Sequence, residues 1–155
     1  ARTYSRDELL GRTAYVEYGC AYCHSQQVRD PSYGADHALG WGPTSRPADY
    51  IHDRPHLLGT MRTGPDLSNI GARQSNRDWH HLHLYDPRQL VSWSIMPGFS
   101  FIYQRVTSDS KPADNAVVIP GAADSWIVPS EKAERLVDYL LSLKHKEPTS
   151  SELSR

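Results

Sequence analysis

The feature that most constrains this chain is a five-residue string, Cys20-Ala21-Tyr22-Cys23-His24. The chain contains only two cysteines, so both lie in this string and no third cysteine can pair with either. Two thiols separated by two residues, with a histidine directly after the second, form the attachment motif of haem c. The thiols add to the two vinyl groups of one haem, and the histidine lies beneath the iron. We therefore predict one covalently bound haem c, attached through Cys20 and Cys23 and ligated by His24.

Other uses of the two cysteines are possible. A disulfide across two residues is strained, and a redox CxxC motif normally accompanies a βαβ pattern, which this sequence lacks. Zinc is the stronger rival, because His80, His81 and His83 could complete a Cys₂His₂ ligand set. These histidines do not all share one face of a helix, so we expect at most one or two to point inward. We expect them to be solvated or hydrogen-bonded.

The second axial ligand of the iron must come from elsewhere in the chain. The chain has two methionines, Met61 and Met96. Pro97 holds the backbone after Met96 extended, which presents a side chain inward from a loop. We predict Met96 as the sixth ligand, with Met61, a histidine or an open position as alternatives, although the ordinary role of a methionine is core packing. Ligation by histidine and methionine raises the reduction potential and suits an electron carrier.

Composition excludes several other classes of protein. The 17 basic and 18 acidic residues give a net charge of -1, so there is no bulk electrostatic case for binding nucleic acid or an anionic membrane. The longest apolar runs are only a few residues, too short to span a bilayer. Hydrophobic residues make up 38% of the chain, which is low for a globular protein. A buried macrocycle would add the missing cohesion.

Periodicity predicts an all-α fold of short helices and long loops. The length of 155 residues suits one domain, which we place at residues 1–146, followed by a polar tail at 147–155. Proline and glycine indicate loops over 30–60 and 97–129. The expected helices are one capped by Ser5 and ended by Gly19, one capped within 75–78 and running to about Tyr85, a short one over 88–93, and one capped by Ser130.

The order of motifs resembles class I cytochrome c. The CxxCH string is followed by Gly-Pro-Asp-Leu at 64–67, Met-Pro at 96–97 and Leu-Val-Asp-Tyr-Leu at 136–140. Two longer strings, GCAYCHSQ at 19–26 and RTGPDL at 62–67, resemble the mono-haem cytochrome c subunit (subunit II) of cbb3-type haem–copper oxidases. The resemblance covers residues 8 to 101, and we find none from 101 to 129.

This resemblance implies the cytochrome c fold and several site residues. The Pro65 carbonyl should accept the Nδ1–H of His24, which fixes the ring and raises its basicity. The surface around Gly11 and Tyr15 should cross the terminal helix near Leu136 and Tyr139. The candidate partners of the haem propionates are Arg62, Arg73 and Trp79, whose ordinary alternatives are surface charge and a core indole.

The resemblance also implies a function. We expect one-electron transfer, as the relay subunit of a terminal oxidase rather than as an enzyme on its own. The expected partners are the catalytic oxidase subunit or other cytochromes c. The family has an amino-terminal membrane helix, so we expect a native anchor that this chain lacks, and a location on the periplasmic side of the bacterial inner membrane. The alternatives are a freely diffusing periplasmic electron carrier and, from another class, a zinc-structured binding module.

Overall fold

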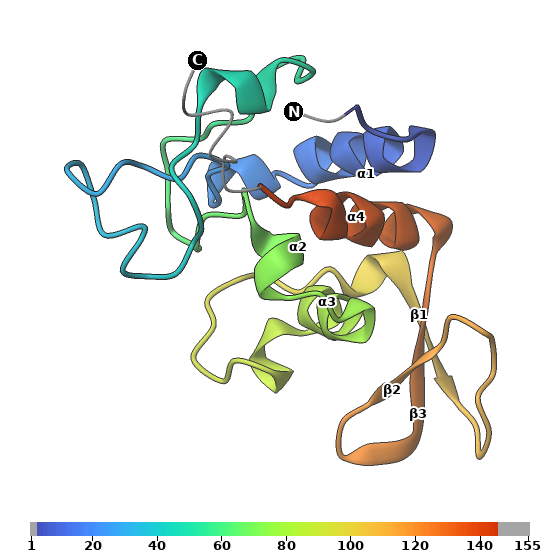
Figure 1. Ribbon diagram of the computed structural model, residues 1–155. Coiled ribbons are helices and arrows are strands. Elements are labelled where there is room, and N and C mark those ends of the chain that lie inside the picture. Colours follow the sequence, from blue (N-terminus) through green and yellow to red (C-terminus); the bar gives the residue numbers. More distant parts are fainter. Residues whose placement is uncertain (1–2, 146–155) are drawn as a thin grey trace. The chain divides into compact units, whose positions relative to one another are not determined.

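The structure is a computed structural model that describes residues 3–145, so the tail expected at 147–155 lies outside the described residues. These residues divide into two compact units, one of residues 3–5, 16–75 and 140–145, the other of residues 6–15 and 76–139. With η for a 3₁₀-helix, the elements are α1 (Arg6–Glu17), η1 (Cys20–Tyr22), η2 (Pro47–Tyr50), α2 (Ile70–Arg73), α3 (Arg77–Tyr85), η3 (Pro87–Gln89), η4 (Ser100–Ile102), β1 (Tyr103–Thr107), β2 (Val117–Ile119), β3 (Ala122–Pro129) and α4 (Glu131–Ser142), as Figure 1 shows.

The first unit is mostly irregular chain. Its long loop contains only the short helix η2, in agreement with the loop predicted over 30–60. Gly71 places α2 directly against the end of α4, because a Cβ on Gly71 would lie 2.2 Å from the carbonyl oxygen of Leu141. The backbone N–H of Gly71 donates to the carbonyl of Leu143 at 3.0 Å. Backbone contact between α2 and the carboxyl end of α4 therefore closes this unit.

The second unit contains a three-stranded antiparallel sheet in the order β1-β3-β2. β3 is the central strand, with Val106 opposite Trp126 on one side and Val117 opposite Ile127 on the other. A buried cluster of Leu82, Val117, Ile119 and Ile127 joins α3 to the sheet, with Tyr85, Leu90 and Tyr103 packed around it. The apolar face of α3 thus forms one core with two of the three strands.

The start of α1 crosses α4 in the same unit, as expected from the resemblance. Figure 1 shows the two helices side by side. Gly11 makes the closest approach, because a Cβ there would lie 1.8 Å from the carbonyl oxygen of Arg135 and 2.9 Å from the Cβ of Tyr139. The Tyr15 and Tyr139 rings meet edge to face with centroids 5.5 Å apart, and both side chains are buried.

The all-α prediction is wrong, because the structure combines helices with an antiparallel sheet. The error lies in the stretch 97–129, where the prolines predict loops but the chain forms strands. Pro120 and Gly121, with a φ of 80° at Gly121, form the two-residue turn between β2 and β3, and Pro129 is the last residue of β3. Prolines at turns and strand ends are compatible with a sheet. Alternation within β3, where Ser125 and Ile127 are buried and Trp126 is half-buried, was the available strand signal.

The helix predictions fared better. α1, α3 and α4 occur where their caps indicated, and the Asn76 side chain accepts the backbone N–H of Trp79 at 3.0 Å. The hydroxyl of Ser130 accepts the backbone N–H of Ala133 at 3.2 Å. The helix predicted over 88–93 is wrong, since only the 3₁₀ turn η3 forms there. Side-chain caps are local signals, which explains why these boundaries could be predicted.

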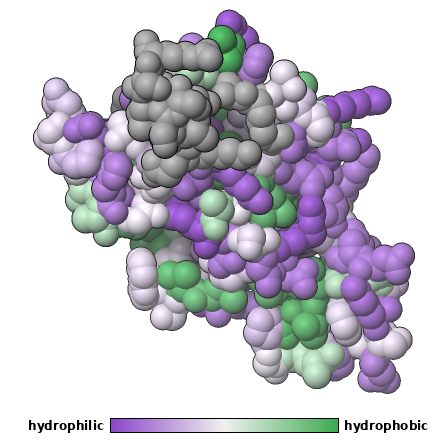
Figure 2. Space-filling model, viewed as in Figure 1, coloured by the Kyte–Doolittle hydropathy of each residue, from purple (hydrophilic) through white to green (hydrophobic). Residues whose placement is uncertain are grey.

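The surface is largely polar. On the face drawn in Figure 2, hydrophilic residues predominate and hydrophobic residues occur in separate patches. Between residues 3 and 145, no helix has the length and hydrophobicity that crossing a bilayer requires.

Replacing Gly11 by alanine should destabilise the second unit, although alanine is the better helix former by about 1 kcal/mol. The added methyl group would overlap the backbone of α4, which has to move away. We expect the free energy of unfolding, measured by urea denaturation, to fall by about 2–3 kcal/mol. Thr13→Ala on the exposed side of α1 is the control and should change it by less than about 0.5 kcal/mol. A Gly11→Ala variant as stable as the wild type would contradict the close crossing.

Candidate haem site

The two cysteines lie on one tight turn of the first unit. Gly19 precedes η1 with a φ of 73°, a left-handed conformation that glycine adopts without strain. The backbone N–H groups of Cys23 and His24 both donate to the carbonyl of Cys20, at 3.2 and 3.0 Å. Both thiols are free, Cys20 half-buried and Cys23 exposed, and burial raises the pKa of Cys20 to about 12. The turn thus presents two thiols and an imidazole from five consecutive residues.

The imidazole of His24 is oriented by a backbone carbonyl. Its Nδ1 lies 2.7 Å from the carbonyl oxygen of Pro65, the contact expected from the resemblance. Because a carbonyl only accepts, Nδ1 carries the proton and Nε2 keeps a free lone pair. Burial lowers the pKa of His24, against the opposing effects of the Pro65 carbonyl and the Asp66 carboxylate. The result is a neutral imidazole with Nε2 available, the form that binds iron.

Gly64 supplies the space for this ring. A Cβ on Gly64 would lie 2.3 Å from Cε1 of His24, so no other residue fits here with the ring in place. The backbone N–H of Gly64 donates to the carbonyl of Cys23 at 2.9 Å, and that of Leu67 donates to the carbonyl of Ser25 at 2.8 Å. Residues 23–25 and 64–67 therefore run side by side, one segment carrying the ligand and the other its support. The donor set and the cradle fit a haem attached at Cys20 and Cys23.

Asp66 is a functional candidate that sequence reasoning missed. Its side chain is completely buried, and it accepts three hydrogen bonds. Oδ2 accepts the Ser25 hydroxyl at 2.6 Å and the Gln27 N–H at 2.7 Å, while Oδ1 accepts the Ser68 N–H at 2.8 Å. The sequence signal for Asp66 is its position in the Gly-Pro-Asp-Leu string, directly after Pro65.

Arg62 lies within the protein beside this carboxylate. Its Nε donates to the Ser25 hydroxyl at 2.8 Å, and Nη1 and Nη2 bind both oxygens of Asp36 at 2.7 and 2.8 Å. The guanidinium also lies 5.1 Å from the ring centroid of Trp41. Although burial opposes it, hydrogen bonding to Arg62 and to the backbone of Arg29 lowers the pKa of Asp36. The role predicted for Arg62 at a haem propionate stays a prediction beside these protein contacts.

The two other predicted propionate partners, Arg73 and Trp79, also have contacts within the protein. Arg73, in the first unit, donates from Nη2 to the carbonyl of Asp66. Trp79, in the second unit, stacks on His83 with ring centroids 4.6 Å apart and planes 8° from parallel. Contact with a propionate stays a prediction for both.

The two methionines differ in exposure. Met96 lies in the second unit and is half-buried, and its carbonyl accepts Nη1 of Arg88 at 3.2 Å. Met61 lies in the first unit and is 59% exposed. Of the two, Met96 has the more sheltered side chain, as a ligand requires.

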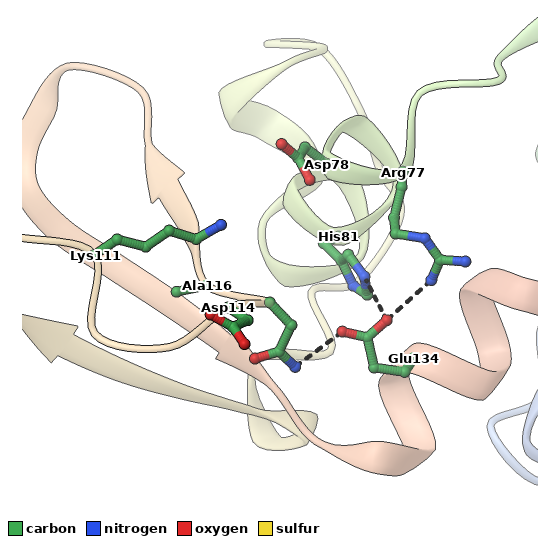
Figure 3. Close-up of a pocket in the computed structure, with 8 residues that line it drawn as sticks. Arg77, Asp78, His81, Lys111, Asp114, Ala116 and Glu134 are labelled. Carbon is green, nitrogen blue, oxygen red and sulfur yellow. Dashed lines mark hydrogen bonds and ion pairs between the residues drawn. The ribbon is translucent and has the colours of Figure 1, made fainter.

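One histidine of α3, His81, belongs to a second polar site, shown in Figure 3. His81 is buried, with Nε2 3.4 Å from the Glu134 carboxylate and Nδ1 3.2 Å from the Tyr103 hydroxyl. Arg77 and Asn115 also bind Glu134, both at 2.9 Å. Burial lowers the pKa of His81, while Glu134 opposes the shift. A pocket of about 320 Å³ is lined by Arg77, Asp78, His81, Lys111, Asp114, Asn115, Ala116 and Glu134.

Neither site forms a zinc centre. Among residues 3–145, no group of three or more His, Cys, Asp and Glu side chains is placed to hold a metal ion. The Cys₂His₂ alternative therefore has no ligand set in the described part of the chain.

The chain was compared with models of known protein families. The model of the family described as cytochrome c oxidase, mono-heme subunit/FixO, matches residues 1–132. The match extends beyond the resemblance seen over 8–101 and includes all three strands. No individual curated protein matched the chain.

Proposed function

Because this chain belongs to the FixO family of mono-haem cytochrome c oxidase subunits, we propose that it relays single electrons through one haem c. Its role is that of the electron-transfer subunit of a cbb3-type terminal oxidase, with oxygen chemistry left to a catalytic subunit. When bound, haem supplies an iron that exchanges one electron between its ferric and ferrous forms.

The observation that carries this proposal is the hydrogen bond from His24 to Pro65. It holds the proton on Nδ1 and leaves Nε2 as an iron ligand. Cys20 and Cys23 would hold the haem, each by adding its S–H across one vinyl group so that sulfur bonds to one carbon and hydrogen to the other. With His24 as an iron ligand, one turn of the chain would supply all three attachments.

Met96 completes the proposed coordination. A thioether is a soft donor that favours ferrous iron, so His24 and Met96 together raise the reduction potential. The half-buried position of Met96 supports this choice over Met61. Arg62, Arg73 and Trp79 are the proposed propionate partners.

The proposed partners are the catalytic oxidase subunit and other cytochromes c, on the periplasmic side of the bacterial inner membrane. A membrane helix outside this sequence would anchor the domain. The charge pattern supports a held relay, because no lysine occurs before Lys111, whereas a diffusing carrier needs a charged rim around its haem edge. The freely diffusing carrier is the second candidate, since the exposed Arg6 and Arg29 could replace such lysines in part, whereas Arg12 is buried.

Covalent attachment is the first test. The haem should remain with the chain through acid–acetone extraction and denaturing electrophoresis, and mass spectrometry should give one haem per chain. The Cys20→Ala, Cys23→Ala double variant is the control and should lose the haem under the same conditions. A chain with the mass of the apoprotein and bound zinc would disprove the haem assignment.

The sixth ligand is tested by exchanging the two methionines separately. Met96→Ala should abolish the weak far-red absorption band of methionine-ligated ferric haem and lower the midpoint potential, because a thioether stabilises ferrous iron. Met61→Ala should leave both unchanged. The haem should stay attached in both variants, since Cys20 and Cys23 hold it independently. The opposite pattern would identify Met61 as the ligand.

The partner proposal is tested by the salt dependence of electron transfer. A relay held beside its acceptor has no diffusional encounter to steer, so its rate should change less than about twofold between 0.05 and 0.5 M salt. Stopped-flow oxidation of the chain by a soluble cytochrome c measures the rate of electron transfer between diffusing partners. Turnover of the assembled oxidase measures the rate of a relay that is held in place. A steep fall of the rate in the assembled oxidase would favour the freely diffusing carrier, because salt screens steering between exposed charges.

A further inference from the structure

We propose that Asp66 is the residue that positions the His24 imidazole, and that its buried carboxylate thereby sets the reduction potential at this ligand. The inference rests on the proposed haem at His24. Asp66 does not contact the imidazole. It acts through the backbone of the two segments that carry His24 and its carbonyl partner Pro65.

The contacts of Asp66 bridge these segments. From the residue directly after Pro65, it accepts the Ser25 hydroxyl and the Gln27 N–H, on the residues that follow His24. Its other oxygen accepts the N–H of Ser68 within its own segment. The hydrogen bond between His24 and Pro65 lies beside these contacts, so any separation of the segments lengthens it.

A carboxylate is the only common side chain that can make all of these bonds. It accepts through both oxygens, and all three of its partners are donors. An asparagine of the same shape turns one oxygen into an NH₂ group, which then faces a donor. Because Asp66 is fully buried, no water can relieve that conflict. The unsatisfied buried donor therefore weakens the bridge, that is, the hydrogen bonds that join Asp66 to Ser25 and Gln27.

Asp36 offers a matched comparison in the same unit. It is also buried, and it also pairs with Arg62, whose Nη2 lies 3.9 Å from Asp66. Its backbone partner, however, is the N–H of Arg29, outside both segments that hold His24. Asp36→Asn and Asp66→Asn therefore remove the same charge beside the same cation, but only Asp66→Asn directly changes the acceptor of the Ser25 hydroxyl and the Gln27 N–H.

Both effects of Asp66→Asn on the potential have the same sign. Ferric haem carries one more positive charge than ferrous haem, so loss of a nearby negative charge favours the ferrous form. A longer bond from His24 to Pro65 makes the imidazole a weaker donor, which also favours the ferrous form. The midpoint potential should therefore rise in Asp66→Asn.

The experiment compares Asp66→Asn, Asp36→Asn and Ser25→Ala in the haem-loaded chain. Ser25→Ala keeps the charge of Asp66 and removes one of its bonds. In Asp66→Asn we expect a raised potential, shifted ring-proton resonances of His24, and amide hydrogen exchange at Gln27 roughly tenfold faster or more. Ser25→Ala should show smaller changes of the same sign. Asp36→Asn should change the His24 resonances and the exchange at Gln27 less than Asp66→Asn does, because Asp36 reaches Ser25 and Gln27 only through Arg62.

Equal effects of Asp36→Asn and Asp66→Asn would overturn the proposal, because Asp66 would then act only as one buried charge among others. Unchanged exchange and resonances in Asp66→Asn would overturn it as well. If Asp66→Asn does not fold, Ser25→Ala decides, and a variant identical to the wild type would refute the positioning role. Failure of the proposed function would give a different result, because the wild type itself would then carry no covalent haem. Hydrogen exchange at Gln27 would still show whether Asp66 holds the two segments together.

Discussion

The hydrogen bond between the His24 imidazole and the Pro65 carbonyl, with the Asp66 carboxylate beside it, is the interaction on which the first unit depends. The chain around the haem motif has little regular secondary structure, so helix or sheet ladders cannot satisfy its buried polar groups. A second stretch of chain, about Gly64 to Ser68, satisfies them instead. Each bond to a charged group contributes about 1.5–3 kcal/mol, and together they hold an irregular turn in one conformation.

Burial of charge gives this arrangement its specificity. Asp66 and Asp36 are almost inaccessible to water, and Arg62 lies between them with bonds to Asp36 and Ser25. A buried carboxylate costs several kcal/mol unless it is paired and fully hydrogen-bonded, which both are here. Such a network tolerates few alternative geometries. A rigid support for an axial ligand suits electron transfer, in which the iron must change charge with little movement around it.

The second unit is built by more ordinary rules. Its core is an apolar face of α3 against the sheet, and its helix crossing needs the missing side chain of Gly11. The match of the FixO family covers the residues that form this sheet. The strands escaped prediction because the prolines of this stretch favour loops, β2 has only three residues, and β1 pairs with β3 across a long connection. A strand as short as β2 shows too little alternation to be recognised without its neighbours.

The sequence by itself determined the features that depend on neighbouring residues. The spacing of Cys20, Cys23 and His24 indicates haem attachment, and caps such as Asn76 and Ser130 mark where helices begin, because each acts within a few residues. Tertiary structure decided the rest. Only folding brings Asp66 to Ser25, which lies directly after His24 and 41 positions earlier in the chain than Asp66. Likewise, only the pairing of distant segments makes a sheet. The reason is physical: the energy of a buried charge or a strand depends on partners whose positions exist only once the chain has folded.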